Sequence, residues 1–548
     1  MANDNVKRPT REKGEILLEM RDLRIEGESD DVWHQIVKGV DLTLCRGEVL
    51  GLIGESGAGK STIGIAAMGF ASPGCRFNGG SITFDGIDLM NAPEEVKRKM
   101  RGSRISYVAQ SAAASFNPAH RLIDQTIETE TQQGIRDTQA SIADAKDLYS
   151  RLRLPNPEAI GFRYPHQVSG GQLQRVMTAM AMTCRPDLII FDEPTTALDV
   201  TTQVEVLASI RAIVEEFHTA AIYITHDLAV VAQMAHRIMV LRHGKLVEEA
   251  PTREMLAAPQ DAYTRSLWAV RKLAKEESTT DDLILKVEHV DAAYGSAVKI
   301  LDDVSISVPR GRTVAVVGES GSGKSTLARV VTGLLPPTKG SVKFNGADLP
   351  PALAQRDKES LRRIQMIYQS PDTALNPRQR VYDIIGRPLT FYHNLRGKAL
   401  KDRIVELLKM IELDESYIDR LPGEMSGGQK QRICIARALA AEPDLIICDE
   451  VTSALDQIVQ EEILKLLLRL QAEFEISYLF ITHDIATVRA IADEIVVMNQ
   501  GKVVQQGLKT KVLSPPHPAY TELLLSSVPE MDPDWLTNLL QKRAAKTK

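Results

Sequence analysis

The sequence lacks any long hydrophobic run. No stretch of about 18 consecutive apolar residues, the length that crosses a bilayer as a helix, occurs in its 548 residues. Its beginning, MANDNVKRPTREKGE, is polar and charged and lacks the apolar segment of a secretory signal. We therefore expect a chain that neither spans a membrane nor carries a cleaved leader.

Cysteine is scarce, and charge of a single sign does not dominate. The five cysteines include no CxxC pair, which argues against a zinc or iron–sulfur site and favours reduced thiols. They are Cys45, Cys75, Cys184, Cys434 and Cys448. The net charge is −6 and the isoelectric point is near 6.1, so nothing indicates a nucleic-acid-binding surface. Hydrophobic residues at 43% and charged residues at 25% are typical of a globular chain with buried cores.

Two nine-residue segments of the chain are almost identical. GESGAGKST occupies residues 54–62 and GESGSGKST residues 318–326, and only the fifth letter differs. In each half an apolar run typical of a strand precedes the segment, and a helix-like stretch follows it. This order predicts a phosphate-binding loop, because glycines let successive backbone N–H groups reach phosphate oxygens and the helix N-terminus adds positive potential.

The two loops predict a nucleotide site in each half. We expect Lys60 and Lys324 to neutralise the β- and γ-phosphates, and Ser61 and Ser325 to bind Mg²⁺. The residues predicted to surround the phosphates are Gly54, Glu55, Ser56, Gly57, Ala58, Gly59, Lys60, Ser61 and Thr62 in the first loop, and Gly318, Glu319, Ser320, Gly321, Ser322, Gly323, Lys324, Ser325 and Thr326 in the second.

The similarity between the halves extends far beyond these loops. SGGQ begins at Ser169 and at Ser426, and in both halves it precedes the aspartate of an apolar-Asp-Glu segment by 23 residues. That aspartate in turn precedes a histidine by 34 residues in both halves. The equal spacing predicts a tandem duplication.

The paired acids suit a nucleotide-hydrolysing site. LIIFDE and LIICDE place Asp192 and Asp449 at the end of a predicted strand, where each is positioned to hold Mg²⁺. Glu193 and Glu450 follow directly and are placed to orient or polarise an attacking water. The alternative interpretation is that paired acids only cap a strand and that His226 is an ordinary loop residue; the phosphate loops and the repeated spacing favour the catalytic interpretation.

With these motifs the chain resembles the ATP-binding-cassette (ABC) family. Each half carries the family's ordered set of Walker A loop, Q-loop glutamine, SGGQ signature, Walker B pair, D-loop aspartate and switch histidine. The resemblance implies ATP and Mg²⁺ as cofactors. It implies ATP contacts for Gln110, Ser169, Gly170, Gly171, Gln172, Asp199, Gln369, Ser426, Gly427, Gly428, Gln429 and Asp456; Mg²⁺ binding for Ser61, Gln110, Asp192, Ser325, Gln369 and Asp449; and catalytic roles for Glu193, His226, Glu450 and His483.

The resemblance also implies an α/β fold of two tandem nucleotide-binding domains. Each is expected to be a P-loop ATPase core with a helical insert and a short C-terminal extension, and residues 126–160 and 381–420 have the charged, helical composition of such an insert. The predicted organisation is a disordered tail (1–14), a first domain (15–270), a polar linker (271–283), a second domain (284–510) and a C-terminal extension (511–548).

In this family one ATP lies between the Walker A loop of one cassette and the signature of another. The resemblance therefore implies two composite sites, Lys60 with Ser426 and Lys324 with Ser169. A fused chain supplies each cassette with its partner at high effective concentration.

The two halves differ where an aromatic residue is expected to stack on adenine. Tyr294 suits that role in the second half, whereas Gly27 is its counterpart in the first. Trp33 is the candidate substitute, and a packing tryptophan is the alternative interpretation. The second Walker B segment also has Val451 where the first has Pro194, a difference that we expect to be tolerated.

Further segments resemble importers of peptides, nickel and glutathione. SFNPAHRLIDQT (115–126) and ALNPRQRVYDIIG (374–386) follow the Q-loops, and SPPHPAYTELLLSSVP (514–529) is similar to that group's HPYT-like tail, with Ala519 inserted. The first half has only a weaker copy, APQDAYTRSL (258–267). The alternative interpretation of the tail is a proline-rich surface extension. It lacks the cysteine motif of some relatives, so we expect no metal cluster there.

This resemblance implies an ATPase that drives two transmembrane permease subunits together with an extracytoplasmic solute-binding protein. It would lie at the cytoplasmic face of the inner membrane, bind no nucleic acid and serve peptides first, with nickel, glutathione and glycoside-type solutes open. A soluble twin-cassette ATPase acting on ribosomes or DNA is the alternative; the short linker and the D-loop texts TALD and SALD disfavour it. A regulatory module without turnover is disfavoured because both halves keep the glutamate and the histidine.

Overall fold

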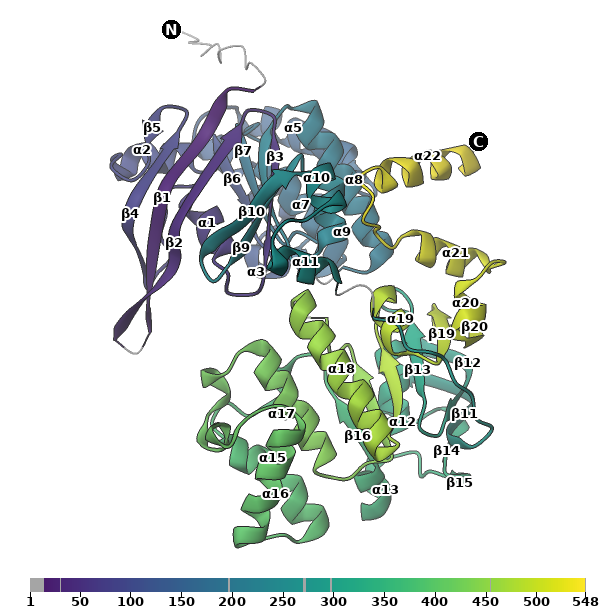
Figure 1. The fold of residues 1–548 in the computed structure, drawn as a ribbon. Helices are drawn as coiled ribbons and strands as arrows, with labels where there is room; N and C mark the ends of the chain where they lie inside the picture. Colours follow the sequence, from purple (N-terminus) through teal and green to yellow (C-terminus); the bar gives the residue numbers. More distant parts are fainter. Residues whose placement is uncertain are drawn as a thin grey trace. The chain divides into compact units, whose positions relative to one another are not determined.

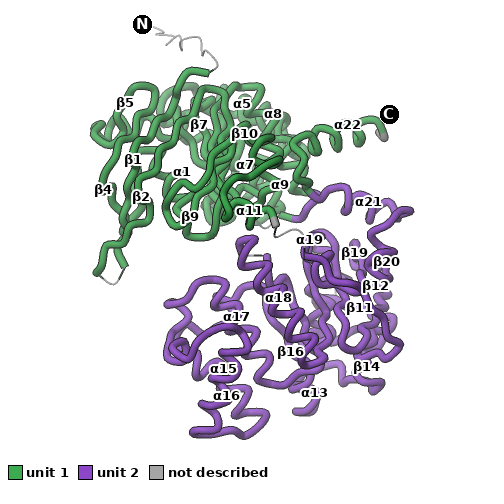
Figure 2. The backbone as a smooth tube through the Cα atoms, viewed as in Figure 1, with its two compact units in different colours: residues 1–198, 202–268, 529–548 green, residues 199–201, 269–528 purple. Residues whose placement is uncertain are grey.

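The computed structural model describes residues 14–29, 31–195, 198–269, 273–295, 298–453 and 455–547. Apart from Gly14, the predicted disordered tail lies outside the described residues. The chain divides into two compact units: unit 1 comprises residues 1–198, 202–268 and 529–548, and unit 2 comprises residues 199–201 and 269–528 (Figure 2). Each unit is described by itself below.

Unit 1 is built on two sheets (Figure 1). The six-stranded sheet has the order β10-β9-β3-β8-β7-β6, in which only β10 runs antiparallel to its neighbour. Its strands are β3 (Val49–Gly54), β6 (Ile105–Val108), β7 (Leu188–Asp192), β8 (Ala220–Ile224), β9 (Arg237–Arg242) and β10 (Lys245–Pro251). The antiparallel sheet has the order β2-β1-β4-β5, with β1 (Ile16–Ser29), β2 (Val32–Cys45), β4 (Cys75–Phe84) and β5 (Ile87–Asp88). Strands β3, β7 and β8 are buried along their whole length, as expected for apolar runs covered on both faces.

Helices cover the parallel sheet of unit 1 and form its insert. They are α1 (Lys60–Ala66), α2 (Glu94–Met100), α3 (Ala112–Ser115), α7 (Gly170–Met182), α8 (Val200–Glu216), α9 (Leu228–Met234), α10 (Thr252–Ala257) and α11 (Ala262–Ala269). The insert contains α4 (Leu122–Gln132), α5 (Thr138–Arg151) and α6 (Pro157–Ile160), followed by the 3₁₀ turn Pro165–Gln167. The predicted helical region 126–160 is therefore confirmed, with α4 beginning four residues earlier because Leu122 and Ile123 are buried in the insert's core.

Unit 2 repeats this architecture with the same strand order. Its six-stranded sheet is β16-β17-β18-β13-β19-β20, and its antiparallel sheet is β12-β11-β14-β15. The strands are β11 (Leu283–Tyr294), β12 (Val298–Pro309), β13 (Thr313–Val317), β14 (Lys339–Phe344), β15 (Ala347–Asp348), β16 (Ile364–Ile367), β17 (Leu445–Asp449), β18 (Ser477–Ile481), β19 (Glu494–Asn499) and β20 (Lys502–Leu508). The matching sheets confirm the predicted α/β duplication.

The helices of unit 2 also correspond to those of unit 1. They are α12 (Lys324–Thr332), α13 (Lys358–Arg363), α14 (Pro371–Ala374), α17 (Gly427–Leu439), α18 (Gln457–Phe474) and α19 (Ile485–Ile491). The insert predicted at 381–420 contains α15 (Val381–His393) and α16 (Gly397–Met410), which lie together beside α17 (Figure 1), and the 3₁₀ turn Glu415–Asp419. A second 3₁₀ turn, Pro422–Glu424, leads into the signature helix.

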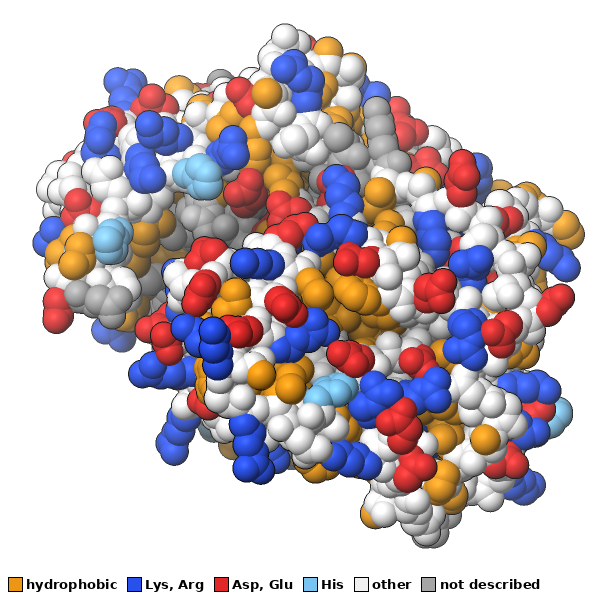
Figure 3. All heavy atoms as spheres, turned by 60° about the horizontal axis from the view of Figure 1, so that its bottom comes forward, with side chains coloured by type: hydrophobic (Ala, Val, Ile, Leu, Met, Phe, Trp, Pro, Cys, Tyr) orange, Lys and Arg blue, Asp and Glu red, His pale blue; other side chains and the backbone are white. Residues whose placement is uncertain are grey.

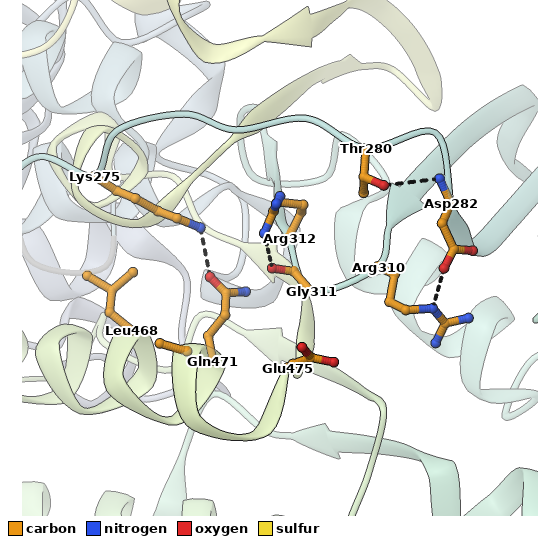
Figure 4. Close-up of a pocket in the computed structure, with 10 residues that line it drawn as sticks. Lys275, Thr280, Asp282, Arg310, Gly311, Arg312, Leu468, Gln471 and Glu475 are labelled. Atoms are coloured by element: carbon orange, nitrogen blue, oxygen red, sulfur yellow. Dashed lines mark hydrogen bonds and ion pairs between the residues drawn. The ribbon is translucent and has the colours of Figure 1, made fainter.

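The described part of the predicted linker packs on unit 2. Lys275 donates to Gln471 Oε1 at 2.7 Å and forms an ion pair with the buried carboxylate of Asp493. Ser278 N also donates to Asp493, at 3.1 Å. Lys275 and Gln471 also line a cavity of about 440 Å³, whose wall includes the Asp282–Arg310 pair (Figure 4). None of the residues that line this cavity belongs to the predicted nucleotide sites.

The C-terminal extension divides between the two units. Helices α20 (Lys509–Leu513) and α21 (Ala519–Ser526) belong to unit 2, whereas residues 529–548 belong to unit 1. There helix α22 (Trp535–Thr547) buries Trp535, Leu536 and Leu539 in the hydrophobic core of unit 1. Gln233 fixes its approach by donating to two backbone carbonyls, Glu530 O at 2.9 Å and Asp532 O at 2.8 Å, and by accepting from Leu536 N.

Candidate nucleotide-binding sites

The parallel sheet brings four motifs to one edge of each unit. Carboxyl ends of parallel strands open at the same edge of a sheet, which is where ligands bind in open α/β folds. In unit 1 the Walker A loop follows β3, Glu193 follows β7, Gln110 lies two residues after β6, and His226 lies two residues after β8. Unit 2 places its counterparts after β13, β17, β16 and β18 in the same way.

Glycine is required at defined points of both Walker A loops. Gly54 and Gly318 have φ of 147° and 155°, and a Cβ on either would lie 2.1 or 2.2 Å from a carbonyl oxygen of the neighbouring strand. Gly59 and Gly323 have left-handed φ of 93° and 104° and are the N-caps of α1 and α12. Within the described residues, no side chain caps either helix, so the N–H groups of the first turn are available to phosphate oxygens.

The Walker A lysines lie folded onto their own loops. Lys60 Nζ donates to Gly54 O and Glu55 O, each at 2.8 Å, and Lys324 Nζ donates to Gly318 O and Glu319 O at the same distances. Burial lowers the pKa of Lys324, opposed by the surrounding carboxylates. Both ammonium groups are thus held beside the loop where a phosphate would bind.

The Walker A serine and the Walker B aspartate meet directly in each unit. Ser61 Oγ donates to Asp192 Oδ1 at 3.0 Å, and Ser325 Oγ donates to Asp449 Oδ1 at 3.1 Å. Burial raises the pKa of both aspartates, although the serine hydrogen bonds act in the opposite direction. A hydroxyl and a carboxylate beside a phosphate loop are the oxygen donors that Mg²⁺ takes in phosphoryl-transfer sites, so the residues present fit this ion.

The Walker B glutamates join the Q-loop glutamine to the switch histidine. In unit 1 Gln110 Nε2 donates to Glu193 at 2.9 Å, and His226 Nδ1 lies 3.1 Å from the other carboxylate oxygen. In unit 2 Gln369 donates to Glu450 at 2.8 Å, and His483 Nδ1 lies 3.5 Å from Glu450 Oε1.

Both glutamates have an unusual backbone conformation. Glu193 and Glu450 have φ of 48° and 50°, the left-handed region that non-glycine residues seldom adopt. Their N–H groups hold them there by donating to Ile224 O and Ile481 O at 2.9 and 3.0 Å. Such strained residues concentrate at functional sites.

In each unit the glutamate shifts the ionisation of the histidine. Burial opposes protonation of His226 and His483, but the hydrogen bond and charge of the adjacent glutamate raise the pKa of both imidazoles. Burial likewise opposes ionisation of Glu450, yet His483 and Lys324 together lower the pKa of that carboxyl group. The pair in unit 2 is therefore an ionised carboxylate held by an imidazole.

The signatures begin long helices in both units. Ser169 and Ser426 are the N-caps of α7 and α17, and each forms a capping box with the glutamine three residues on, Gln172 or Gln429. A Cβ on Gly171 would lie 2.2 Å from Thr202 Cγ2, so this signature glycine permits close packing against the start of α8.

The remaining predicted residues are the D-loop aspartates and the candidate adenine-stacking aromatics. Asp456 is the N-cap of α18, accepting from Val459 N at 3.1 Å, and Asp199 accepts from Thr201 Oγ1 at 2.7 Å. Tyr294, which is 44% exposed at the end of β11, accepts from Arg329 at 2.7 Å. Trp33 stacks under the Arg76 guanidinium at 4.0 Å, so its adenine role stays a prediction.

Three tyrosines that bond to predicted site residues were not predicted from the sequence. Tyr107 OH donates to the second carboxylate oxygen of Asp192, and Met366 occupies the corresponding position of β16. Tyr263 OH accepts from Glu55 N at 3.1 Å, and Tyr520 OH accepts from Glu319 N at 2.9 Å. The sequence signal available for the last two was the Tyr-Thr dipeptide shared by both tail segments.

The surface and the rest of the described chain add little to these sites. On the face drawn in Figure 3, Lys and Arg side chains are interspersed with Asp and Glu. Across the described ranges, no group of three or more His, Cys, Asp or Glu forms a metal cluster. No described helix has the length and apolar character that crossing a membrane demands.

Comparisons with known proteins agree with this geometry. The ABC transporter model matches residues 37–196 and 301–453, and the model for the oligopeptide/dipeptide transporter C-terminal region matches residues 504–548. Glutathione import ATP-binding protein GsiA of Pectobacterium atrosepticum is 35% identical over 561 residues, which cover 94% of this chain and 90% of that protein. GsiA of Escherichia coli K12 is 36% identical with the same coverage.

Two solved structures resemble single cassettes of the chain. CbiO1 from Clostridium perfringens, part of the ABC transporter complex cbiONQ, is 31% identical and covers 42% of this chain and 91% of its own, with a TM-score of 0.39. A dimeric ATP-binding cassette in a post-hydrolysis state bound to ADP and Pi is also 31% identical and covers 41% of this chain and 98% of its own, with a TM-score of 0.37.

The paired Walker sites and the family matches together define the class: this chain belongs to the ABC transporter family and is an ATPase that uses Mg²⁺. Within that family it is a twin-cassette ATP-binding subunit of the importer type, with an oligopeptide/dipeptide-transporter C-terminal region.

Proposed function

We propose that this subunit binds two MgATP, one at each Walker A loop, and uses their hydrolysis to drive permease subunits that import peptides or a related small solute such as glutathione. The observation that carries the proposal is the same cluster in both units: serine on aspartate, and glutamate between glutamine and histidine. The C-terminal match and the glutathione importers among the relatives support the solute class.

The residues divide the chemistry among themselves. Bound Mg²⁺ would neutralise charge on the β- and γ-phosphates, held by Ser61 and Asp192 in unit 1 and by Ser325 and Asp449 in unit 2. The Walker A N–H groups and the lysine bind phosphate oxygens; Lys60 exchanges its two loop carbonyls for them on binding.

The glutamates orient the attacking water and accept its proton. Glu193 is held by Gln110 and His226, and Glu450 by Gln369 and His483, so each carboxylate is fixed before nucleotide arrives. Preorganisation of this kind avoids the cost of ordering the side chain during the reaction.

Each site is proposed to need both cassettes. The pairing is Lys60 with Ser426 and Lys324 with Ser169, and Tyr294 stacks on adenine at the second Walker A loop. The family relationship supports the pairing, as does the presence of a capped signature helix in both units.

The proposed partners are two transmembrane permease subunits, met at the cytoplasmic face of the inner membrane, and an extracytoplasmic solute-binding protein. No contact with nucleic acid is proposed. The test is reconstitution: we expect purified protein to be a slow ATPase that reconstituted permeases and loaded binding protein stimulate. Stimulation by ribosomes, with none by the permeases, would contradict the proposal.

A further inference from the structure

Each tail segment sends one tyrosine back to the Walker A loop of its own unit. In unit 1 Tyr263, the second residue of α11, accepts a hydrogen bond from Glu55 N at 3.1 Å. In unit 2 Tyr520, the second residue of α21, accepts one from Glu319 N at 2.9 Å. The same atom of the same loop position is bound in both, and the two tail segments share an Ala-Tyr-Thr sequence at this point.

With the tyrosine, both backbone polar groups of this loop residue are hydrogen-bonded to side chains. The carbonyl oxygen of Glu55 accepts from Lys60, and its N–H donates to Tyr263. Glu319 is gripped in the same way by Lys324 and Tyr520. When the lysine binds a phosphate instead, the hydrogen bond to the tyrosine still connects the loop to the tail.

The tail helix of unit 1 is built to hold its tyrosine in place. Glu248, on β10, accepts from the backbone N–H groups of Gln260 and Asp261 at 2.8 and 2.9 Å, which anchors the start of α11. Tyr263 is 5% exposed, and the Arg242 guanidinium lies 4.5 Å from the centroid of its ring. The anchored helix start and the burial of the ring therefore fix the direction of its hydroxyl.

The tail helix of unit 2 reaches the same result with other contacts. Tyr520 packs against a cluster that includes Val317, the last residue of β13 before the loop, and Leu524 of α21 itself. Thr264 and Thr521, which follow the two tyrosines, are both fully buried. The Tyr-Thr pair is thus the shared structural unit of both tails.

We propose that Tyr263 and Tyr520 are positioning residues for the two nucleotide sites, each fixing the Walker A loop of its unit in the phosphate-binding conformation. The inference rests on the proposed function of these loops. By this proposal, the C-terminal extension of each cassette stabilises the Walker A loop of the same cassette. The donor and acceptor atoms are assigned as tyrosine oxygen accepting and backbone N–H donating.

The test measures ATP binding to the full-length chain with one site disabled at a time. Lys324→Ala leaves the first site, and Lys60→Ala leaves the second. We expect Tyr263→Phe to weaken ATP binding about 3- to 10-fold at the first site and to leave the second unchanged, the scale of one lost hydrogen bond. Tyr520→Phe should show the reverse pattern.

Two further readouts separate positioning from general destabilisation. Hydrogen exchange of the peptide containing Glu55 should accelerate in Tyr263→Phe, because its N–H loses its acceptor. Tyr149→Phe is the matched control: it removes a buried hydroxyl that bonds Thr126 Oγ1 at 2.7 Å within the helical insert. The control should leave ATP affinity at its parental value.

The possible outcomes distinguish this inference from the function on which it rests. Parental ATP affinity in both tyrosine variants would overturn the inference alone. So would an equal loss at both sites from either single variant, since that pattern reports a general structural effect. A parent protein that binds no ATP would overturn the proposed function together with the inference.

Discussion

At the scale of single residues, the site depends on side chains that are held before nucleotide binds. Glu193 and Glu450 have left-handed backbones, with their carboxylates set between a glutamine amide and an imidazole. A strained residue fixed by several hydrogen bonds is a preorganised group, which is what a water-orienting base requires.

The first prediction concerns this base. With Glu193→Gln and Glu450→Gln together, ATP hydrolysis should fall by at least about 10²-fold, because the amide cannot accept the water's proton. MgATP should still bind, because Lys60 and Lys324 are unchanged. Turnover is measured by phosphate release and binding by equilibrium dialysis. Near-parental turnover in the double variant would remove both residues from the catalytic role.

The second prediction concerns the difference between the two Mg²⁺ sites. Tyr107 donates to Asp192, whereas Met366 stands at the matching position in unit 2. Groups that orient a metal ligand commonly contribute 10- to 100-fold to metal affinity. Tyr107→Phe should therefore raise the Mn²⁺ concentration needed for nucleotide-dependent binding at the first site by about 10-fold, measured by electron paramagnetic resonance.

Met366→Leu is the matched control for that measurement. It alters the same position of the strand in unit 2 without removing a hydrogen bond to the aspartate, so Mn²⁺ binding there should not change. Equal Mn²⁺ affinity in Tyr107→Phe and the parent would show that the phenol has no influence on the ion.

The conformation of the Walker A loops could be expected from the sequence, whereas the contacts of Tyr107, Tyr263 and Tyr520 could not. Walker A geometry is local, because glycines such as Gly54 and Gly59 impose their conformation within a few residues. The contact of Tyr263 with Glu55 joins residues 208 positions apart, and the shared Tyr-Thr dipeptide does not indicate which residue the tyrosine contacts. The difference between Tyr107 and Met366 could be interpreted only from the structure, because β6 pairs with β7 and so brings Tyr107 to Asp192.

At the scale of elements, the helical inserts followed from composition but the last helix did not. Residues 126–160 and 381–420 were recognisable because charged helical patterns stand between two fixed motifs. The sequence of helix α22 predicts a helix, but it does not indicate which unit the apolar side chains pack against. The structure places Trp535, Leu536 and Leu539 in the core of unit 1.

The third prediction tests this docking. Leu536 is fully buried in the core of unit 1, so Leu536→Ala should destabilise that unit by about 2–4 kcal/mol. Hydrogen exchange with denaturant, followed on peptides of unit 1 and unit 2 separately, measures the effect. The control is Leu523→Ala on α21, where the side chain is 39% exposed and the change should stay within about 0.5 kcal/mol. Unchanged protection of unit 1 in Leu536→Ala would contradict the docking.

At the scale of the whole molecule, the duplication covers the sheets and the nucleotide-site motifs of both units. Both units have the same strand order, the same motif at the end of each corresponding strand, a capped signature helix and a tail tyrosine on the Walker A loop. A chain that carries two sets of nucleotide-site motifs suits an ATPase whose sites each take a Walker A loop from one cassette and a signature from the other.

Cross-linking tests that pairing most directly. The structure guides the choice of positions: Ala58 and Ser322 are 2% exposed, whereas Ser56, Ser169, Ser320 and Ser426 are exposed. The background has all five native cysteines replaced and carries Glu193→Gln and Glu450→Gln. In it, the pair Ser56→Cys and Ser426→Cys should be cross-linked by a short bifunctional thiol reagent when ATP is present. Ser320→Cys with Ser169→Cys should behave alike, and Ser56→Cys with Ser169→Cys should give little product. ATP-dependent cross-linking of position 56 to position 169, with none to position 426, would mean that each cassette closes on itself, and the account of two shared ATP sites would be wrong.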